Sequence, residues 1–317
     1  MRITNRMMMD NAVQNMADNR ERINKLQTKL STTKQFQSAS EDPEHASANL
    51  SLRSHLQTLE SFTDAAENAH NWMTASDSSL DQIEQIATRA NTLILNGLTD
   101  SISIEAKFSL SSEIQDLVNQ AFEVGNTSVN GQYIFAGFQV NNKAFSLTDS
   151  PTTLTDYTGH TFTPKVISYL GDSGSIQRTL GPDQSVALNI NGNQAILGLV
   201  QNLILASNAL MQNNIHKTGN AATDPLTLEA ALGGVKSSMD GIDQERASNG
   251  ARLRQVESAA GFLESVKIET KSLISANEDT NMAEGIALLA NQQTTYEAVL
   301  EVSQRAISAL SLFDYLR

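Results

Sequence analysis

Residues 43–97 read PEHASANLSLRSHLQTLESFTDAAENAHNWMTASDSSLDQIEQIATRANTLILNG, and this stretch carries the strongest periodic signal in the sequence. Apolar or small residues recur in it every seven positions: Leu52, Leu59, Ala66, Met73, Leu80, Ala87 and Ile94. A second series lies three residues after members of the first: Phe62, Ala69, Ser76, Ile83 and Ala90. A seam of this kind, sustained over the whole stretch, predicts one long coiled-coil-like helix.

The ends of this helix are also marked in the sequence. Asp42 can cap its first turn and Pro43 fits the first helical position, whereas Asn96-Gly97 is a stop signal. At about 1.5 Å per residue the helix would be roughly 80 Å long. We therefore expect a helical rod.

A second long pattern runs from about 226 to 276, and shorter helices fit residues 103–124 and 195–212. Arg246 and Asn249 interrupt the second seam. Polar residues at seam positions often set the register of a coiled coil at some cost in stability. We therefore expect Arg246 and Asn249 to align this helix with its partner.

The middle of the chain changes character. Short β-branched runs separated by turn signals fill residues 132–194: YIFAGF, TLTDYT, HTFTPKVISY, SIQRTL and QSVALNI. The predicted fold is mainly α, with a small inserted β domain and a coiled-coil-like rod built from both chain halves. The predicted division is terminal helices (1–42 and 278–317, the assembly core), a rod domain (43–131 and 195–277) and the β domain (132–194).

Composition narrows the function. The net charge of −13 argues against general nucleic-acid binding, because a phosphate-binding protein needs a basic face. No apolar run approaches the roughly 18 residues of a membrane span, and the N-terminus lacks the features of a secretory signal. The interspersed acids Asp10, Asp18 and Glu21 disfavour binding of the basic N-terminal segment to an anionic membrane. We expect neither nucleic acid nor a membrane as a partner.

Catalytic signals are incomplete. Residues 171–174 spell GDSG, but the nearest upstream histidine, His160, sits at a turn 13 residues away, so a Gly-rich turn is the better interpretation. The chain has no cysteine, and no pair of histidines has the spacing of metal ligands on one helix face. We predict no catalytic residues, no cofactor and no metal, and hence no enzyme.

The terminal segments carry apolar stripes that two paired helices cannot bury alone. We therefore predict an assembly interface at Met9, Val13, Met16, Ile23, Leu30, Leu289, Tyr296, Leu300, Ile307, Leu310 and Phe313. Residues 1–34 hold seven Arg and Lys against three acids, a net of +4, and residues 278–317 hold six acids against two Arg, a net of −4. The two segments could attract each other or present two independent solvated faces.

Three stretches resemble the bacterial flagellin superfamily: LSTTKQFQSASEDP (30–43), NGQYIFAGF (130–138) and residues 279–317, which end in SLFDYLR. The family often has glycine at the bend where this chain has Thr33. The resemblance implies a structural protein, an adapter that polymerises as a junction zone between the flagellar hook and filament. The alternatives are flagellin, the bulk filament subunit, and a coiled-coil chaperone or effector of another secretion system.

The resemblance also implies partners and a location. Partners would be further copies of the chain, the neighbouring hook-side junction protein, flagellin and a flagellar export chaperone. The protein would serve motility outside the cell, secreted through the flagellar type III channel without a cleavable signal. The family's terminal segments tend to be disordered in the free subunit and to fold as paired helices in the assembly.

Overall fold

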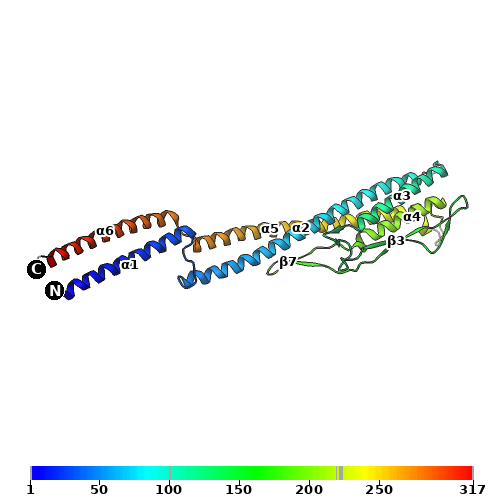
Figure 1. Ribbon diagram of the computed structural model, residues 1–317. Coiled ribbons are helices and arrows are strands. Elements are labelled where there is room, and N and C mark those ends of the chain that lie inside the picture. Colours follow the sequence, from blue (N-terminus) through cyan, green and yellow to red (C-terminus); the bar gives the residue numbers. More distant parts are fainter. Residues whose placement is uncertain (1, 100, 219, 221–223, 316–317) are drawn as a thin grey trace. The chain divides into compact units, whose positions relative to one another are not determined.

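The computed structural model describes residues 2–99, 101–218, 220 and 224–315 (Figure 1). The helices are α1 (Arg2–Thr32), α2 (Pro43–Gly97), α3 (Ile104–Gly125), the π-helical turn η1 (Asn193–Leu197), α4 (Gly198–Gln212), the 3₁₀ turn η2 (Asp224–Leu226), α5 (Leu228–Glu278) and α6 (Met282–Tyr315). The strands are β1 (Ser128–Val129), β2 (Gln132–Tyr133), β3 (Phe145–Asp149), β4 (Leu154–Thr155), β5 (Thr161–Phe162), β6 (Lys165–Tyr169), β7 (Gln177–Gly181) and β8 (Gln184–Ala187). The fold is mainly α with a small β portion, as the periodicity predicted.

The chain divides into two compact units. Residues 1–59 and 265–317 form the first, which contains α1, α6 and the outer ends of α2 and α5. Residues 60–264 form the second, which contains the rest of α2 and α5, the helices α3 and α4, and every strand. The predicted division into three domains remains a prediction.

The long helices confirm the heptad pattern. Helix α2 begins at Pro43 and ends at Gly97, and Asp42 accepts a hydrogen bond at 3.1 Å from the His45 amide, as expected of a cap. In the second unit the seam residues of α2 and their apolar counterparts on α5 form the core and are fully buried: Ala66, Met73, Leu80, Ala87, Ile94, Val235, Ile242 and Val256. Burial of this stripe is what holds the two helices together.

The two polar residues of the second seam contact α2. The side chain of Asn249 is fully buried, and its amide donates at 3.0 Å to the carbonyl oxygen of Met73. The Arg246 guanidinium lies against Asp81 at 3.0 Å, Asp77 at 3.7 Å and Glu84. Because each contact needs one alignment of the two helices, these residues fix the register of α2 against α5.

Helix α4 packs beside α3 in the second unit (Figure 1). The Ser111 hydroxyl of α3 donates to the Ser207 carbonyl oxygen of α4 at 3.0 Å, and both serines are buried. Residues 193–212 are long and apolar enough to cross a membrane by length and composition. Half of this stretch is buried within the protein, with α3 and β6 among its neighbours, as in the core helix of a globular unit.

The β portion consists of four separate antiparallel pairs: β1–β2, β3–β6, β4–β5 and β7–β8. The run YIFAGF was wrong as a strand, because only Tyr133 belongs to one and Ile134, Phe135 and Ala136 are buried in turns. Strand β3 was missed, since FSLTD offers few β-branched residues. Its partner β6 supplies the register, with Leu147 opposite Ile167.

The GDSG stretch is a turn that binds the end of the YIFAGF run. A carboxylate oxygen of Asp172 accepts from the Phe138 and Gly174 amides, each at 2.8 Å. Gly137 has φ +69, and a Cβ there would lie 2.2 Å from the same oxygen, so only glycine fits. The Tyr169 hydroxyl donates to this turn, and burial, followed by the charge of Asp172, raises the pKa of Tyr169 to about 12. These contacts support a structural role.

Candidate assembly interface

Helices α1 and α6 lie side by side and antiparallel in the first unit (Figure 1). The Gln292 amide donates to the Asn19 side-chain oxygen at 2.6 Å. Nearer the bend, a Cβ on Gly285 would come within 2.7 Å of the Leu30 side chain, so glycine allows a close approach of the helices. This pair confirms that the two terminal segments meet within one chain.

Six of the predicted interface residues lie partly buried in this pair: Met16, Ile23, Leu30, Leu289, Tyr296 and Leu300. Val13 is 55% exposed. The side chains of Met9, Ile307, Leu310 and Phe313 lie outside the part that the structure describes. Six of the seven described stripe residues therefore pack between α1 and α6, and whether the stripe also touches another chain stays a prediction.

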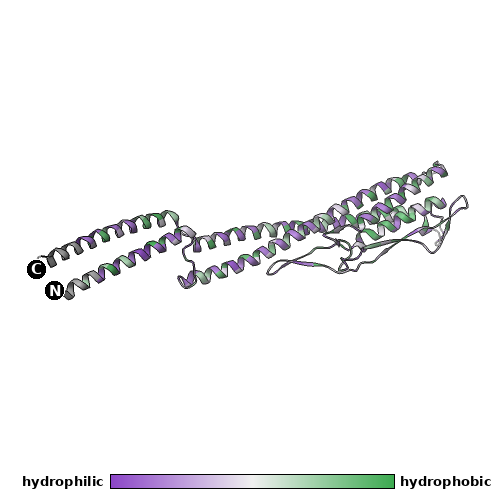
Figure 2. Ribbon diagram, viewed as in Figure 1, coloured by the Kyte–Doolittle hydropathy of each residue, from purple (hydrophilic) through white to green (hydrophobic). Residues whose placement is uncertain are grey.

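Further apolar side chains of the pair face solvent. On α6 these are Met282, Ile286, Leu288 and Val302, of which Ile286 is 57% and Val302 66% exposed. Figure 2 shows more hydrophobic residues along α6 than along α1. Met282 and Ile286 fit the heptad pattern of this segment, whereas Leu288 and Val302 lie off it and could not be found from periodicity. The pair therefore leaves an apolar surface uncovered.

Some charged side chains of α1 and α6 form ion pairs within their own helix and not between the two helices. Lys25 binds Glu21 at 2.7 Å on α1, and Arg305 binds Glu301 on α6. These pairs are exposed, and such pairs contribute little stability. Apolar packing is thus the main stabilising contact of the pair, and the role of net charge stays a prediction.

A strained bend ends α1. Thr33 has φ +58, in the left-handed region that is costly for a β-branched residue. Its carbonyl oxygen accepts from the Thr280 amide at 2.9 Å, and the Gln35 amide donates to the Glu278 carbonyl oxygen at 2.7 Å. Two backbone hydrogen bonds therefore join the segment between α1 and α2 to the segment between α5 and α6. We call residues 33–35 and 278–280, which these bonds connect, the strap. The strap holds Thr33 in its left-handed conformation.

A buried carboxylate lies beside this strap. One oxygen of Glu278 accepts from Asn49 at 2.7 Å and Arg53 at 2.6 Å, and the other lies 3.3 Å from Lys34. The hydrogen bond from Arg53 is the main cause that lowers the pKa of Glu278, with burial opposing it. Lys34 also binds Asp279 at 2.7 Å, which is the main cause that raises the pKa of Lys34.

Sequence reasoning missed this cluster. Its members belong to three separate segments, and Asn49 and Glu278 are 229 residues apart. The available signal was a pair of acids, Glu278-Asp279, at the end of a helical pattern where solvent-facing residues are the usual expectation.

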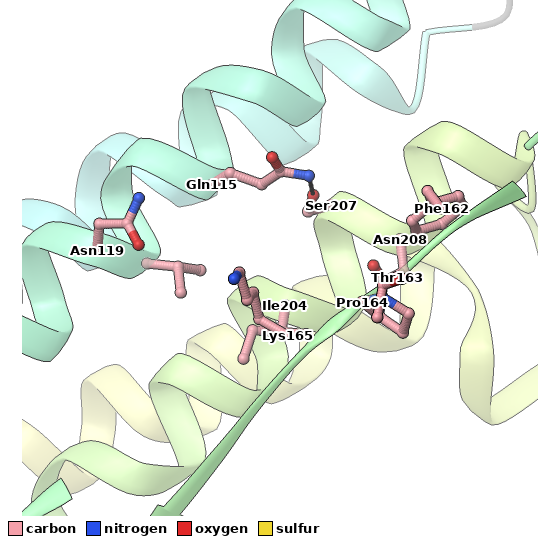
Figure 3. Close-up of a pocket in the computed structure, with 10 residues that line it drawn as sticks. Gln115, Asn119, Phe162, Thr163, Pro164, Lys165, Ile204, Ser207 and Asn208 are labelled. Carbon is pink, nitrogen blue, oxygen red and sulfur yellow. Dashed lines mark hydrogen bonds between the residues drawn. The ribbon is translucent and has the colours of Figure 1, made fainter. Parts of the chain in front are cut away.

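One pocket of the second unit offers little chemistry. The pocket in Figure 3 has a volume of about 100 Å³ and lies between α3, α4 and the residues before β6. Lys165, its titratable lining residue, is paired with Asp149 at 2.6 Å. Within the described part of the chain, no group of three His, Cys, Asp or Glu side chains could hold a metal ion.

Comparison with known proteins shows similarity to flagellar proteins. Residues 3–140 match the model of the bacterial flagellin N-terminal helical region. The flagellar hook-associated protein 3 of Escherichia coli (strain K12) is 24% identical over 276 residues, which cover 81% of this chain and 82% of that protein.

Solved structures share the fold. A putative flagellar hook-associated protein from Vibrio parahaemolyticus matches with a TM-score of 0.61 at 13% identity, over 75% of this chain and 100% of that one. Bacillus cereus FlgL matches with a TM-score of 0.55 at 20% identity, over 71% of this chain and 99% of that one. Over residues 3–140 the chain is similar to the bacterial flagellin N-terminal region, over most of its length it is similar to a flagellar hook-associated protein, and it shares the fold of the solved hook-associated proteins.

Proposed function

We propose that this chain is the structural adapter between the flagellar hook and filament, and that it acts by polymerising as a junction zone. The relative that covers four-fifths of the chain is a hook-associated protein. The observation that carries a role in assembly is the exposed apolar surface of α6, which includes Ile286 and Val302. A surface helix with uncovered apolar residues on an acidic chain marks an interaction site.

We propose that neighbouring copies of the chain cover the exposed apolar surface of α6. The interface comprises the eleven residues predicted from the stripes together with Ile286 and Val302. Repeated head-to-tail contacts of one kind generate rings or open helical tubes, which suits a junction zone. The proposed partners are further copies of the chain, a hook-side junction protein and flagellin. We further propose that an export chaperone binds the chain before export and that the chain leaves the cell through the flagellar type III channel. We propose no catalytic activity for it.

Deletion of the gene tests the function. Electron microscopy of the deletion strain should show bare hooks, and the medium should contain abundant shed flagellin, because filament subunits would lack the surface on which they start. Bare hooks with no flagellin made or shed would instead identify the chain as flagellin. Normal filaments would exclude both roles.

Substitutions at two exposed residues of α6 test the proposed interface. We expect the double variant Ile286→Asp/Val302→Asp to keep the fold of the free chain and to lose assembly, because charge cannot be buried against a neighbour. Leu170→Asp, at an exposed apolar residue of the second unit, is the control. Assembly is measured by sedimentation and by complementation of the deletion strain. Normal assembly of the double variant would contradict this interface.

A further inference from the structure

The bend after α1 and the bend before α6 share one set of contacts. Two backbone hydrogen bonds cross between them, from the Gln35 amide to the Glu278 carbonyl oxygen and from the Thr280 amide to the Thr33 carbonyl oxygen. Neither bend can leave its conformation without breaking bonds to the other. The strained Thr33 adds to this dependence, since a left-handed threonine persists only where its surroundings hold it.

The Glu278 side chain ties this strap to the body of the first unit. It lies on the last residue of α5 and reaches Asn49 and Arg53 on α2, while its second oxygen reaches Lys34 in the strap. A second contact holds the same ends together, because the Asn277 amide donates to the His45 carbonyl oxygen at 2.9 Å. One carboxylate at the end of α5 therefore contacts both α2 and the bend after α1.

The surroundings of the Glu278 carboxylate make the stability of the cluster depend on its negative charge. The Glu278 side chain is 12% exposed and accepts charge-assisted hydrogen bonds, which are stronger than neutral ones. Loss of the negative charge would leave Arg53 with no anion beside it in this cluster and would leave Lys34 with Asp279 alone. Arg53 and Lys34 are 58% and 37% exposed, so water screens their side of these pairs, whereas Asn49 is buried and donates to Glu278 as its acceptor.

We propose that Glu278 is a clasp that makes the two bends, residues 33–42 and 279–281, form and open as one unit. The clasp couples the ordering of α1 to the ordering of α6, which enter these bends from opposite ends of the chain. It acts within a single chain and does not depend on the role of the protein in the flagellum.

Hydrogen–deuterium exchange of the full chain, read at single residues by mass spectrometry, tests the clasp at the Gln35 and Thr280 amides. In Glu278→Gln we expect both amides to exchange about tenfold faster, and by the same factor, because loss of a hydrogen bond to a charged group favours local opening. The matched control is Glu269→Gln, at an exposed glutamate of the same helix, which should exchange like the wild type.

A second variant keeps the test informative. Arg53→Gln removes a clasp contact from α2 without touching either bend, and it too should accelerate both amides. The double variant Glu278→Gln/Arg53→Gln should exchange no faster than Glu278→Gln alone, because the two residues act through one contact. Acceleration of only one amide, equal exchange in the Glu278 and Glu269 variants, or complete exchange of both wild-type amides at the first time point would each overturn the clasp.

Discussion

At the scale of the residue, Thr33 shows how surrounding contacts can hold a backbone conformation that the side chain itself disfavours. The bend needs a left-handed residue, which glycine adopts freely. Thr33 adopts it at φ +58, and its hydroxyl donates to the Thr32 carbonyl oxygen at 2.7 Å. Two cross-bend hydrogen bonds and the Glu278 cluster offset the strain. The bend is therefore set by its tertiary contacts.

Replacing this residue by glycine should relieve the strain. We expect Thr33→Gly to raise the free energy of unfolding by about 1 kcal/mol or less, since the relief of roughly 1–2 kcal/mol exceeds the added flexibility of the unfolded chain. Thr32→Gly, one residue earlier and inside α1, should lower it by about 0.5 kcal/mol. Urea unfolding followed by circular dichroism measures both, and equal destabilisation by the two changes would refute the strain.

Glu278 gives the first unit a dependence on pH. Its folded-state pKa is lowered, so the ionised form stabilises the fold above the ordinary glutamate value of about 4.3, and this stabilisation is lost as the pH falls through the lower folded value. Glu278→Gln should therefore unfold more easily than the wild type at pH 7, and the difference should shrink toward pH 3. Denaturant midpoints across this range measure it. A difference that stays constant with pH would show that the charge of Glu278 is not the cause.

At the scale of the element, the pairing of α2 with α5 rests on an apolar seam with polar interruptions. Buried alanine, leucine and isoleucine supply the apolar burial, but a uniform seam tolerates a shift by one heptad. Arg246 and Asn249 meet partners at only one alignment. Arg246 and Asn249 thus make the pairing of α2 with α5 less stable than an all-apolar seam would, but they restrict it to one register.

Replacing Arg246 by an uncharged residue should show how much its charge contributes to the pairing of α2 with α5. We expect Arg246→Met to lower stability by about 1–2 kcal/mol, because Asp77, Asp81 and Glu84 would then repel one another without it. The loss should be smaller at high salt, which screens the partly exposed carboxylates. Thermal unfolding at two salt concentrations measures the effect, and Arg254→Met on the exposed side of the same helix is the control. An equal loss at both salts would mean that packing, not charge, is responsible.

At the scale of the whole molecule, the two units differ in how they are held. The second unit has a continuous buried core of helices and strands. In the first unit, α1 and α6 form a pair whose described stripe residues are only partly buried. Fewer buried contacts mean easier local opening, so the terminal pair is the part of the chain that gains most from a neighbour.

Limited proteolysis should reveal this difference. In the free chain we expect the first cuts to fall within residues 1–32 and 282–317, while a fragment that contains residues 45–275 persists. Assembled protein should resist cutting at both ends, because neighbours cover them. Mass spectrometry of the fragments locates the cuts. A confirmed monomer whose terminal helices resist as long as the second unit would contradict the prediction.

The amino-acid sequence alone was enough to predict the long helices and their ends. These follow from local signals, since a heptad pattern, a capping Asp42 and a Pro43 act within a few turns of one helix. It also indicated that Arg246 and Asn249 set a register, and the structure supplied their partners. The net charge of −13 also argued against nucleic acid as a partner, and this stays a prediction.

The bends, the Glu278 cluster and the pairing of the strands became visible only in the folded structure. The cluster joins Asn49 to a residue 229 positions away, and β3 is specified by its register against β6 rather than by its own propensity. Contacts of this kind depend on which segments the fold brings together, and a pattern read along the chain carries no information on that. Thr33 illustrates the point, because the conformation it adopts is the one its own side chain disfavours.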